Sequence, residues 1–468
     1  MLNTTKRVLA LLLALAMVFA LAGCKKSTTV SEVVVYEDDP DASQGGPTQS
    51  GNSNPVSGSD TPSGTDTPSG TDTPSGDVDL KALEGTTVRF AATLMPEDDG
   101  SAYIIEGFEK KYKMNVKIDY VTLDGYIQEV QGLIANGNSP DVGRSNGDFP
   151  GCLAYFDSLD KAKIDFDDPI WNQNTFRLST FNGVPYMCDT YGCYWTELDI
   201  CIYSKKLLNA AGCPTPQQLA QQGKWTWDNF MNIAELCTQK MGAPAGCINT
   251  PELALHMGGG NVFKIQDEKI VSGINADTTA VIRRYAEAWK KGILNSQSTA
   301  GIVQGITAIG TGHAWSLRKD GDIAKGATAD YGFYFLPAYK EGGATPATGI
   351  FRGFGVIRGA SNPVGAGVFL RYYLDINNYD TENAFINEDA KTFFFQLTTQ
   401  DYAENYNPYL TYIGLNQEIA GLNYSQDIYA VMKMDPSAVD AKMSAVKAAV
   451  EKGAANLNKH IQQYVYSN

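Results

Sequence analysis

In the N-terminal part of the folded chain, the hydrophobic positions switch between the period of a strand and that of a helix. Residues 86–92 (TTVRFAA) form a short apolar run that predicts a buried strand, and residues 114–120 predict a second one. Residues 103–111, between them, carry apolar residues on one side at helical spacing. Residues 125–135 predict another helix before a third strand near Val142. This alternation predicts an α/β fold in which a parallel sheet has helices on its faces.

Ligands of parallel sheets bind beyond the carboxyl ends of the strands. The loops at 94–101 and 143–149 are therefore the first candidate contacts. Three polar residues, Arg144, Asn146 and Asp148, follow the third strand and are predicted to face a cleft. An ordinary surface or capping role is the alternative for each of them.

Aromatic residues gather within residues 183–230, around the entrance of a strand predicted at 200–203. They do not follow one face of a helix. Flat rings beside a carboxylate suit a sugar, because its C–H faces stack on the rings and its hydroxyls bond the acid. Trp195 and Glu197 are the candidates in this segment. Packing of the rings in the core is the alternative interpretation.

Apolar spacing predicts further helices over 205–211, 227–240, 277–292 and 437–457. A glycine-rich segment at 348–357 contains Phe351 and Arg352. Glycine lets a backbone approach a ligand closely, and a guanidinium suits hydroxyls or a carboxylate.

The N-terminus has the features of a bacterial lipoprotein signal. Lys6 and Arg7 precede an uncharged apolar run at 8–22, which is too short for a good transmembrane helix. The run ends in Leu-Ala-Gly-Cys24, which resembles a lipobox and implies cleavage before Cys24 with diacylglycerol on its thiol. We therefore expect a protein anchored by lipid at the extracellular face of a bacterial membrane. An ordinary secretory signal with a chance cysteine is the alternative.

The amino-acid composition predicts a disordered tether and argues against a nucleic acid as the partner. Residues 27–80 contain no Lys or Arg, and a Thr-Pro-Ser-Gly-Thr-Asp hexad repeats from residue 61, which predicts a disordered segment. The chain has 37 Lys and Arg against 52 Asp and Glu, a net charge of −15, so it is a poor nucleic-acid binder. Its 468 residues exceed one ordinary core, so two lobes are expected.

Cysteine and histidine usage gives no metal or cofactor signal. The cysteines after Cys24 are odd in number, so at least one is free or pairs outside the chain: Cys152, Cys188, Cys193, Cys201, Cys213, Cys237 and Cys247. Cys188 and Cys193 could bridge a small loop, and buried free thiols are the alternative. The sequence has no Cys-x-x-Cys pair and only scattered histidines, so we expect no metal and no cofactor.

A series of short motifs carries a family resemblance. Gly-Val-Pro-Tyr at 183–186 is followed by Tyr-Ser-Lys at 203–205, Ala-Gly-Cys-Pro-Thr-Pro at 211–216 and Lys-Trp-Thr-Trp-Asp-Asn-Phe at 224–230. This order resembles the extracellular solute-binding proteins of ABC importers, the maltose-binding-like family, and the resemblance covers about residues 85–375. Residues 306–315 and 331–336 resemble strands of that family, and residues 364–374 resemble one of its helices. The turn that ends the first of these strands usually offers an aromatic ring to the ligand, so the resemblance makes His313 and Trp315 candidate contacts. A core or surface role is the alternative for His313. In that family an aromatic residue often stands at both turn positions occupied here by His313 and Trp315. The histidine weakens any claim for maltodextrin as the ligand.

The resemblance implies a two-lobed, periplasmic-binding-protein-like α/β fold, in which each lobe is a mostly parallel sheet flanked by helices and crossover hinge strands join the lobes. The expected organisation is a signal peptide at 1–23, a lipidated tether at 24–84, a first lobe at 85–196, a second lobe at 197–346, a return to the first lobe at 347–400, and C-terminal helices on the second lobe at 401–468. The expected ligand-binding residues are Arg144, Asn146, Asp148, Trp195, Glu197, His313, Trp315, Phe351 and Arg352.

The resemblance also implies a monomeric binding protein, not an enzyme, that delivers a small solute to ABC permease subunits. A carbohydrate is the expected solute, and a peptide, an acidic sugar or another polar solute remains open. One alternative is a surface-anchored glycan-active enzyme, which would need two positioned carboxylates such as Glu197 and Asp148. Another alternative is an adhesin or sensor with the same fold and no transporter.

Overall fold

The computed structural model describes residues 78–96, 101–145, 147–190, 198–248, 251–297, 299–319, 321, 323, 330–399, 406–408, 410, 415–422 and 425–466. The expected signal peptide, Cys24 and nearly all of the expected tether lie outside the described residues. So do the candidates Asn146, Trp195 and Glu197, and Cys193.

The first sheet contains the strands predicted at the start of the folded chain. Among the described residues its order is β12-β3-β1-β2, with the bounds β1 Thr87–Ala92, β2 Asn115–Tyr120, β3 Val142–Arg144 and β12 Phe354–Val356. β1 is parallel to β2 along its whole length and parallel to β3. The predicted parallel pairing is thus confirmed, whereas the returning strand β12 is antiparallel to β3.

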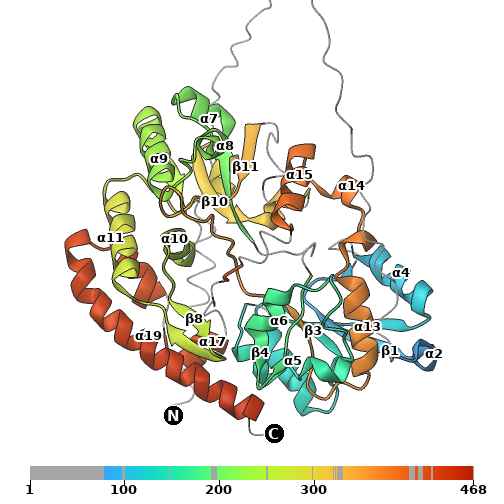
Figure 1. Cartoon of the computed structure of the whole chain (residues 1–468). Coiled ribbons are helices and arrows are strands. Elements are labelled where there is room, and N and C mark those ends of the chain that lie inside the picture. Colours follow the sequence, from blue (N-terminus) through green and yellow to red (C-terminus); the bar gives the residue numbers. More distant parts are fainter. Residues whose placement is uncertain are drawn as a thin grey trace, which may run out of the picture. The chain divides into compact units, whose positions relative to one another are not determined.

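Helices α4 (Ala102–Tyr112), α5 (Tyr126–Ala135) and α13 (Pro363–Tyr373) accompany this sheet, as Figure 1 shows. The ring of Phe108, fully buried on α4, meets the ring of Phe369 on α13 edge to face, with centroids 5.2 Å apart. Burial of such large rings is the main favourable term that holds a helix to a sheet. The helices predicted from spacing in this part of the chain are confirmed.

A short helix, α2 (Leu80–Leu83), precedes β1, where we expected the tether to continue to residue 84. The carboxylate of Asp79 caps this helix by accepting two backbone N–H bonds of 3.1 and 3.2 Å. Leu80 and Leu83 pack against the core of the first sheet. The folded body therefore begins earlier than expected. The residues around these leucines are polar, so the sequence pattern did not predict that the two leucines pack on the core.

The second sheet is mixed. Among the described residues its order is β11-β6-β10-β7, with the bounds β6 Asp199–Ser204, β7 Gly246–Cys247, β10 Ile309–His313 and β11 Tyr331–Tyr334. β10 and β11 are antiparallel to β6, and β10 is parallel to β7. The expectation of a mostly parallel sheet in each lobe is therefore wrong here. The reason is that β6, the first strand after the crossover, runs opposite to β10 and β11.

The helices predicted over 205–211, 227–240 and 277–292 are present as α7 (Lys205–Ala210), α9 (Trp227–Met241) and α11 (Ala276–Lys290). α7 and α9 contact strands β6, β7 and β10 of the second sheet, whereas α11 packs against α10 and α19 (Figure 1). Trp225 and Trp227 are buried, and the Trp225 indole N–H donates to the carbonyl oxygen of Phe335 at 2.8 Å.

Helix α15 (Glu388–Leu397) gives a correction to the expected domain boundaries. We expected residues 347–400 to return to the first lobe, and within this range β12 pairs with β3 of the first sheet and α13 packs on the same sheet. α15, however, contacts β11 and the 3-10 helix η3 (Ala314–Leu317), and its Phe393 and Phe394 share a hydrophobic cluster with Ile200 of β6. The apolar face of α15 packs on the second sheet. The sequence pattern predicts that a helix has an apolar face, but it does not show which sheet that face covers.

The C-terminal helices contact both the helix α11 and the segment that follows β3 of the first sheet. α19 (Val439–Ile461), the alanine-rich helix predicted over 437–457, packs along the hairpin strand β9 and along α11. Its His460 Nε2 also lies 3.1 Å from the carbonyl oxygen of Gly151, in the segment that follows β3. Asn416 of α17 (Leu415–Ala420) accepts from Gly151 N–H at 2.8 Å and donates to the carbonyl of Phe149 at 2.7 Å. The expected placement on the second lobe alone is therefore too narrow.

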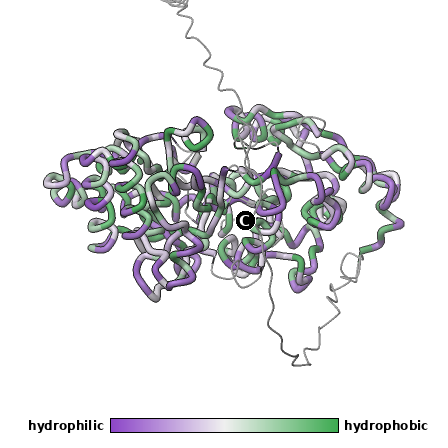
Figure 2. The backbone as a smooth tube through the Cα atoms, turned by 90° about the horizontal axis from the view of Figure 1, so that it is seen from above, coloured by the Kyte–Doolittle hydropathy of each residue, from purple (hydrophilic) through white to green (hydrophobic). Residues whose placement is uncertain are grey.

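The remaining described elements are η1 Gly151–Ala154, η2 Leu159–Ala162, α6 Gln173–Ser179, β4 Thr180–Phe181, β5 Val184–Pro185, α8 Pro216–Gln221, α10 Pro251–Met257, β8 Phe263–Gln266, β9 Lys269–Ser272, α12 Thr299–Val303, η6 Ile376–Asn378, α14 Thr381–Ala384, η7 Ser425–Tyr429, α18 Ala430–Met432, η8 Pro436–Ala438 and η9 Gln462–Tyr466. Short hydrophobic and hydrophilic stretches are intermixed along the backbone (Figure 2).

No helix among the described residues is long and apolar enough to cross a membrane.

The cysteines of the described part of the chain are buried free thiols: Cys152, Cys188, Cys201, Cys213, Cys237 and Cys247. The Cys188 Sγ lies 3.5 Å from the carbonyl oxygen of Phe354, and Cys188 is a free thiol, as the alternative of buried thiols expects; Cys193 lies outside the described residues. Burial raises the pKa of Cys237 and of Cys247 to about 12, which keeps both thiols protonated at neutral pH.

Candidate functional site

The carboxyl ends of the first sheet's strands surround a small hollow of about 80 Å³. The hollow is lined by the ends of β1 and β3 and by the loop after β2. The lining residues in these segments include Thr93, Leu94, Leu123, Arg144 and Ser145. Leu94 and Leu123 are 52% and 57% exposed, which is unusual for leucine and leaves an apolar rim open to solvent. The hollow lies where ligands of parallel sheets bind. We call this site the first edge.

Arg144 is the charged group of the first edge. Its backbone N–H donates to the hydroxyl oxygen of Tyr126 at 2.9 Å, which fixes the end of β3. Its guanidinium lies 5.8 Å from the ring centroid of Phe354 on the neighbouring strand, within cation–π range. The half-buried side chain is thus held in place and offers a positive group beside apolar surface.

Asp148, predicted to face the cleft, is instead 1% exposed. It accepts the hydroxyl of Tyr155 at 2.9 and 3.0 Å on its two oxygens, and the hydroxyl of Ser145 at 3.2 Å. Desolvation, with the Asp148 charge as a second cause, raises the pKa of Tyr155 well above its usual value, so the phenol stays protonated and donates. The carboxylate orders the loop after β3, because these hydroxyls satisfy it internally.

The second sheet presents a compact group where β10 ends and β6 begins. His313 and Asp199 are opposite each other in the antiparallel pair, and His313 Nδ1 lies 2.8 Å from Asp199 Oδ1. The ring of Trp315 in η3 stacks on His313, with centroids 6.0 Å apart and planes 26° apart. His313 and Trp315 are half-buried, so part of each ring faces outward. We call this site the second edge.

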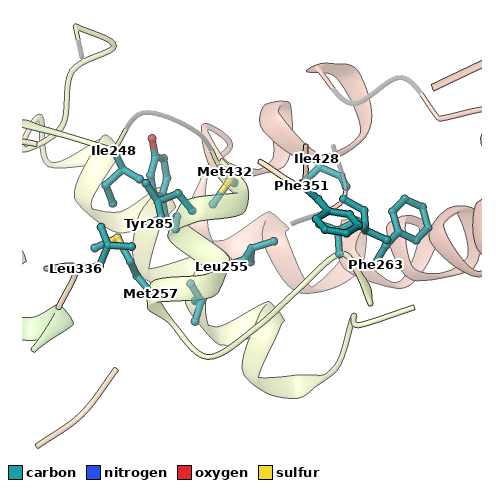
Figure 3. Packing of buried hydrophobic residues seen from close by; sticks show 14 of the residues in the cluster. Ile248, Leu255, Met257, Phe263, Tyr285, Leu336, Phe351, Ile428 and Met432 are labelled. Atoms are coloured by element: carbon teal, nitrogen blue, oxygen red, sulfur yellow. The ribbon is translucent and has the colours of Figure 1, made fainter. Parts of the chain in front are cut away.

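Phe351 and Arg352 have different environments. Phe351 is 1% exposed and packs edge to face on Phe149, with ring centroids 5.0 Å apart. Figure 3 draws it with Phe263 and Ile428 of the same hydrophobic cluster. The prediction that Phe351 stacks on a ligand is therefore wrong: burial against these apolar side chains stabilises it in the core. Arg352 is half-buried and remains a candidate.

Asp199 is the site residue that the sequence reasoning missed. It is fully buried, and its side chain lies against a histidine more than one hundred positions away in the chain. A buried carboxylate that faces a ring nitrogen of a histidine holds the imidazole in one orientation. The signal was an acid at the start of an otherwise apolar strand, but only the register of β6 with β10 gives it a partner.

The described candidates thus fall into two groups, Arg144 at the first edge and His313 with Trp315 at the second. Asp148 and Phe351 belong to neither edge. The sequence matches the family model for the bacterial extracellular solute-binding proteins over residues 92–375, which is more than half of the chain. The chain is a bacterial extracellular solute-binding protein.

Solved structures with this fold cover most of the solute-binding protein. The sugar-binding protein MalE of Xanthomonas citri matches with a TM-score of 0.59 and 16% identity, over 81% of this chain and 100% of that one. A solute-binding protein of Thermotoga lettingae bound with α-D-tagatose has a TM-score of 0.55 and 15% identity, over 80% and 99%. A substrate-binding protein of Listeria monocytogenes in complex with cycloalternan has a TM-score of 0.54 and 14% identity, over 81% and 99%. At these identities the likeness shows the two-lobed fold alone. Among curated proteins, none matches the sequence.

Proposed function

We propose that this solute-binding protein captures a carbohydrate between the first and second edges and delivers it to an ABC importer. It would do so from the outer face of the membrane, held by diacylglycerol on Cys24. Family membership supports solute capture, and the three solved relatives named above were obtained with sugars or are described as sugar-binding. The Leu-Ala-Gly-Cys24 motif supports the lipid anchor.

The second edge carries the proposal. The stacked pair of His313 and Trp315 offers a flat, half-exposed aromatic surface beside an imidazole that Asp199 orients. A pyranose or furanose ring places C–H bonds on its faces and hydroxyls at its rim, so it stacks on the indole while the imidazole bonds a hydroxyl. Arg144 at the first edge would donate to further hydroxyls with its fork of N–H groups.

We further propose that the lobes correspond to the two sheets with their helices, joined by the segments on either side of β6 and β12. Two such segments touch: Leu198 and Gly349 form an antiparallel bridge, and Asp199 N–H donates to the Thr348 carbonyl at 2.8 Å. Paired crossing strands of this kind suit a hinge, since a few residues there absorb the change in backbone angles. A solute held by both edges would favour the closed population.

Within this proposal Asn146, Trp195 and Glu197 remain predicted contacts from the sequence, and Arg352 remains a candidate on the returning segment. The enzyme alternative gains nothing from Asp148, whose oxygens are bonded inside the protein. A pair of catalytic carboxylates built on Asp148 and Glu197 would require Asp148 to leave those bonds.

A thermal-shift screen tests the proposal. The purified protein would be heated with millimolar mono- and oligosaccharides, uronic acids and peptides, since a ligand that binds only the native state raises the melting temperature. We expect a neutral or acidic sugar to raise it, and Trp315→Ala to reduce this shift. Asn232→Ala, an exposed position on α9, is the control that should retain the shift. A peptide as the sole hit, or no hit in the panel, would overturn the carbohydrate proposal.

A further inference from the structure

A groove of about 380 Å³ lies beside β11, at the end of the second sheet that is remote from His313. The register of β6 with β10 gives the separation: His313 is paired with Asp199, whereas Ile309 is paired with Tyr203, which lines the groove. The four steps from Asp199 to Tyr203 span about 13 Å at the usual rise of a strand. The groove is therefore distinct from the second edge, and its volume falls within the roughly 300–1,000 Å³ of small-molecule sites.

Aromatic rings form much of the groove wall. Tyr334 of β11 and Phe393 of α15 are nearly parallel, with planes 15° apart and centroids 6.5 Å apart. Tyr203 lies over Gly332, where a Cβ would meet its ring at 2.1 Å, so the glycine is needed for the tyrosine to reach the groove. Rings of this kind offer faces for stacking.

The polar groups of the groove are neutral and fixed in direction. The Tyr203 hydroxyl donates to Gln217 Oε1 at 2.6 Å, and Gln217 Nε2 donates to the Phe333 carbonyl at 2.9 Å. Desolvation raises the pKa of Tyr203 to about 12, so its hydroxyl stays protonated. The hydroxyl of Thr392 and the amide of Gln396 line the opposite side, on α15.

The charges at the groove offset each other. Lys205 Nζ lies 3.7 Å from Asp389 Oδ2, and both side chains line the groove. Such a pair gives an anionic or cationic ligand no net attraction. Neutral donors and acceptors set among aromatic faces suit a ligand that is uncharged and rich in hydroxyls.

An extended peptide fits less well, although β11 is at the edge of the described sheet. Adding a strand requires free backbone groups along that edge. The carbonyl of Phe333 already accepts from Gln217, and the carbonyl of Phe335 already accepts from the Trp225 indole at 2.8 Å. Side chains therefore occupy acceptors that a peptide strand would use.

We infer that the groove beside β11 is a second carbohydrate site, which takes one or two units of a neutral oligosaccharide independently of the solute cleft. A sugar ring would stack on Tyr334 while its hydroxyls bond Thr392 and Gln396. The site would hold a longer chain, or a neutral wall polysaccharide, at a surface away from the transported solute.

The test uses a protein whose cleft is disabled by Trp315→Ala, titrated with neutral oligosaccharides of two to six glucose, galactose, mannose or xylose units. Calorimetry measures the affinity, and saturation-transfer NMR identifies the sugar protons that contact the protein. Thr392→Trp fills the groove from an exposed position of α15, and Ala455→Trp adds the same side chain at an exposed position of α19 as the matched control. We expect an oligosaccharide to bind Trp315→Ala and its Ala455→Trp double variant alike, and at least tenfold more weakly to the Thr392→Trp double variant.

Two results would overturn the inference: the absence of any oligosaccharide binding to Trp315→Ala, or binding that Thr392→Trp leaves unchanged. A charged oligosaccharide or a peptide that binds the groove more tightly than every neutral sugar would also contradict it. The proposal that the solute binds between the two edges fails in a different way. In that case the Trp315→Ala variant would bind every oligosaccharide as tightly as the unaltered protein does. Melting curves of each variant check that the fold is kept.

Discussion

Asp199 is the single side chain on which the geometry of the second edge depends most. Replacing it with asparagine removes the charge that faces His313 Nδ1 at 2.8 Å, while the size stays the same. Because charge-assisted hydrogen bonds are stronger than neutral ones, Asp199→Asn should lower the affinity for the solute by about tenfold, or about 1.4 kcal/mol. Calorimetry with the sugar found in the screen measures this. Asp277→Asn, at an exposed position of α11, serves as the control, and equal affinities in both variants would contradict the role of Asp199.

A second residue-scale prediction concerns pH. Burial lowers the pKa of His256 to about 4, below the value of about 6.5 in an unfolded chain. The folded state then resists a proton that the unfolded state accepts, so stability is full above pH 6.5 and falls as the pH drops toward 4. The loss reaches at most about 3 kcal/mol.

Urea unfolding at pH 7.5 and 4.5 checks this prediction. His256→Gln cannot titrate, so the difference in unfolding free energy between the two pH values should be smaller for the variant than for the unaltered protein. Equal differences would show that His256 does not contribute to the acid sensitivity of the fold.

Single residues also show how far sequence reasoning reaches. His313 and Trp315 were predicted as ligand contacts from their place at a recognisable strand and turn. The structure brings them together beside Asp199, and their contact with a ligand stays a prediction. Asp148 and Phe351 were predicted wrongly, because the pattern places them near the correct loops but does not show the direction of a side chain. Asp199 was missed because its partner is set by strand register, which no local pattern encodes.

At the scale of elements, the close contact of α13 with η2 gives a prediction with its own control. A Cβ on Gly367 would lie 2.2 Å from the carbonyl oxygen of Ala162, and backbone yields less easily than a flexible side chain. Gly367→Ala should therefore lower the free energy of unfolding by about 2 kcal/mol. Gly132 within α5 has nothing within 4 Å of such a Cβ, so Gly132→Ala should raise stability by about 0.5–1 kcal/mol. Urea unfolding of both variants measures the effects, and a change of the same sign in both would contradict the packing argument.

The elements themselves were the most predictable part of the molecule. The first strands and helices, the returning helix α13 and the long helix α19 follow the expected segments within a few residues, because their apolar spacing is regular. The partner of each element was harder to predict. The antiparallel direction of β6 and the packing of α15 on the second sheet depend on contacts between segments far apart in the sequence.

For the molecule as a whole, the lipid anchor rests on one residue. If the Cys24 thiol carries diacylglycerol, Cys24→Ser should remove the lipid from the N-terminal peptide and lower the share of the protein in the membrane fraction. Fractionation and the mass of the N-terminal peptide measure this. Ser27→Ala, three residues further along, should leave the protein in the membrane fraction. An N-terminal peptide of the unaltered protein whose mass contains no lipid would rule out an anchor at this cysteine.

Closure is the last prediction at this scale. Arg144 is the last residue of β3 in the first sheet and Trp315 follows β10 of the second, so one solute that contacts both favours arrangements that bring the edges together. Saturating sugar should therefore reduce the radius of gyration of the unaltered protein in small-angle X-ray scattering. In Trp315→Ala the sugar would retain contacts with one edge only, and no reduction should follow even at concentrations that occupy the site. If the unaltered protein binds sugar without becoming more compact, capture occurs on a single lobe and the hinge mechanism is wrong.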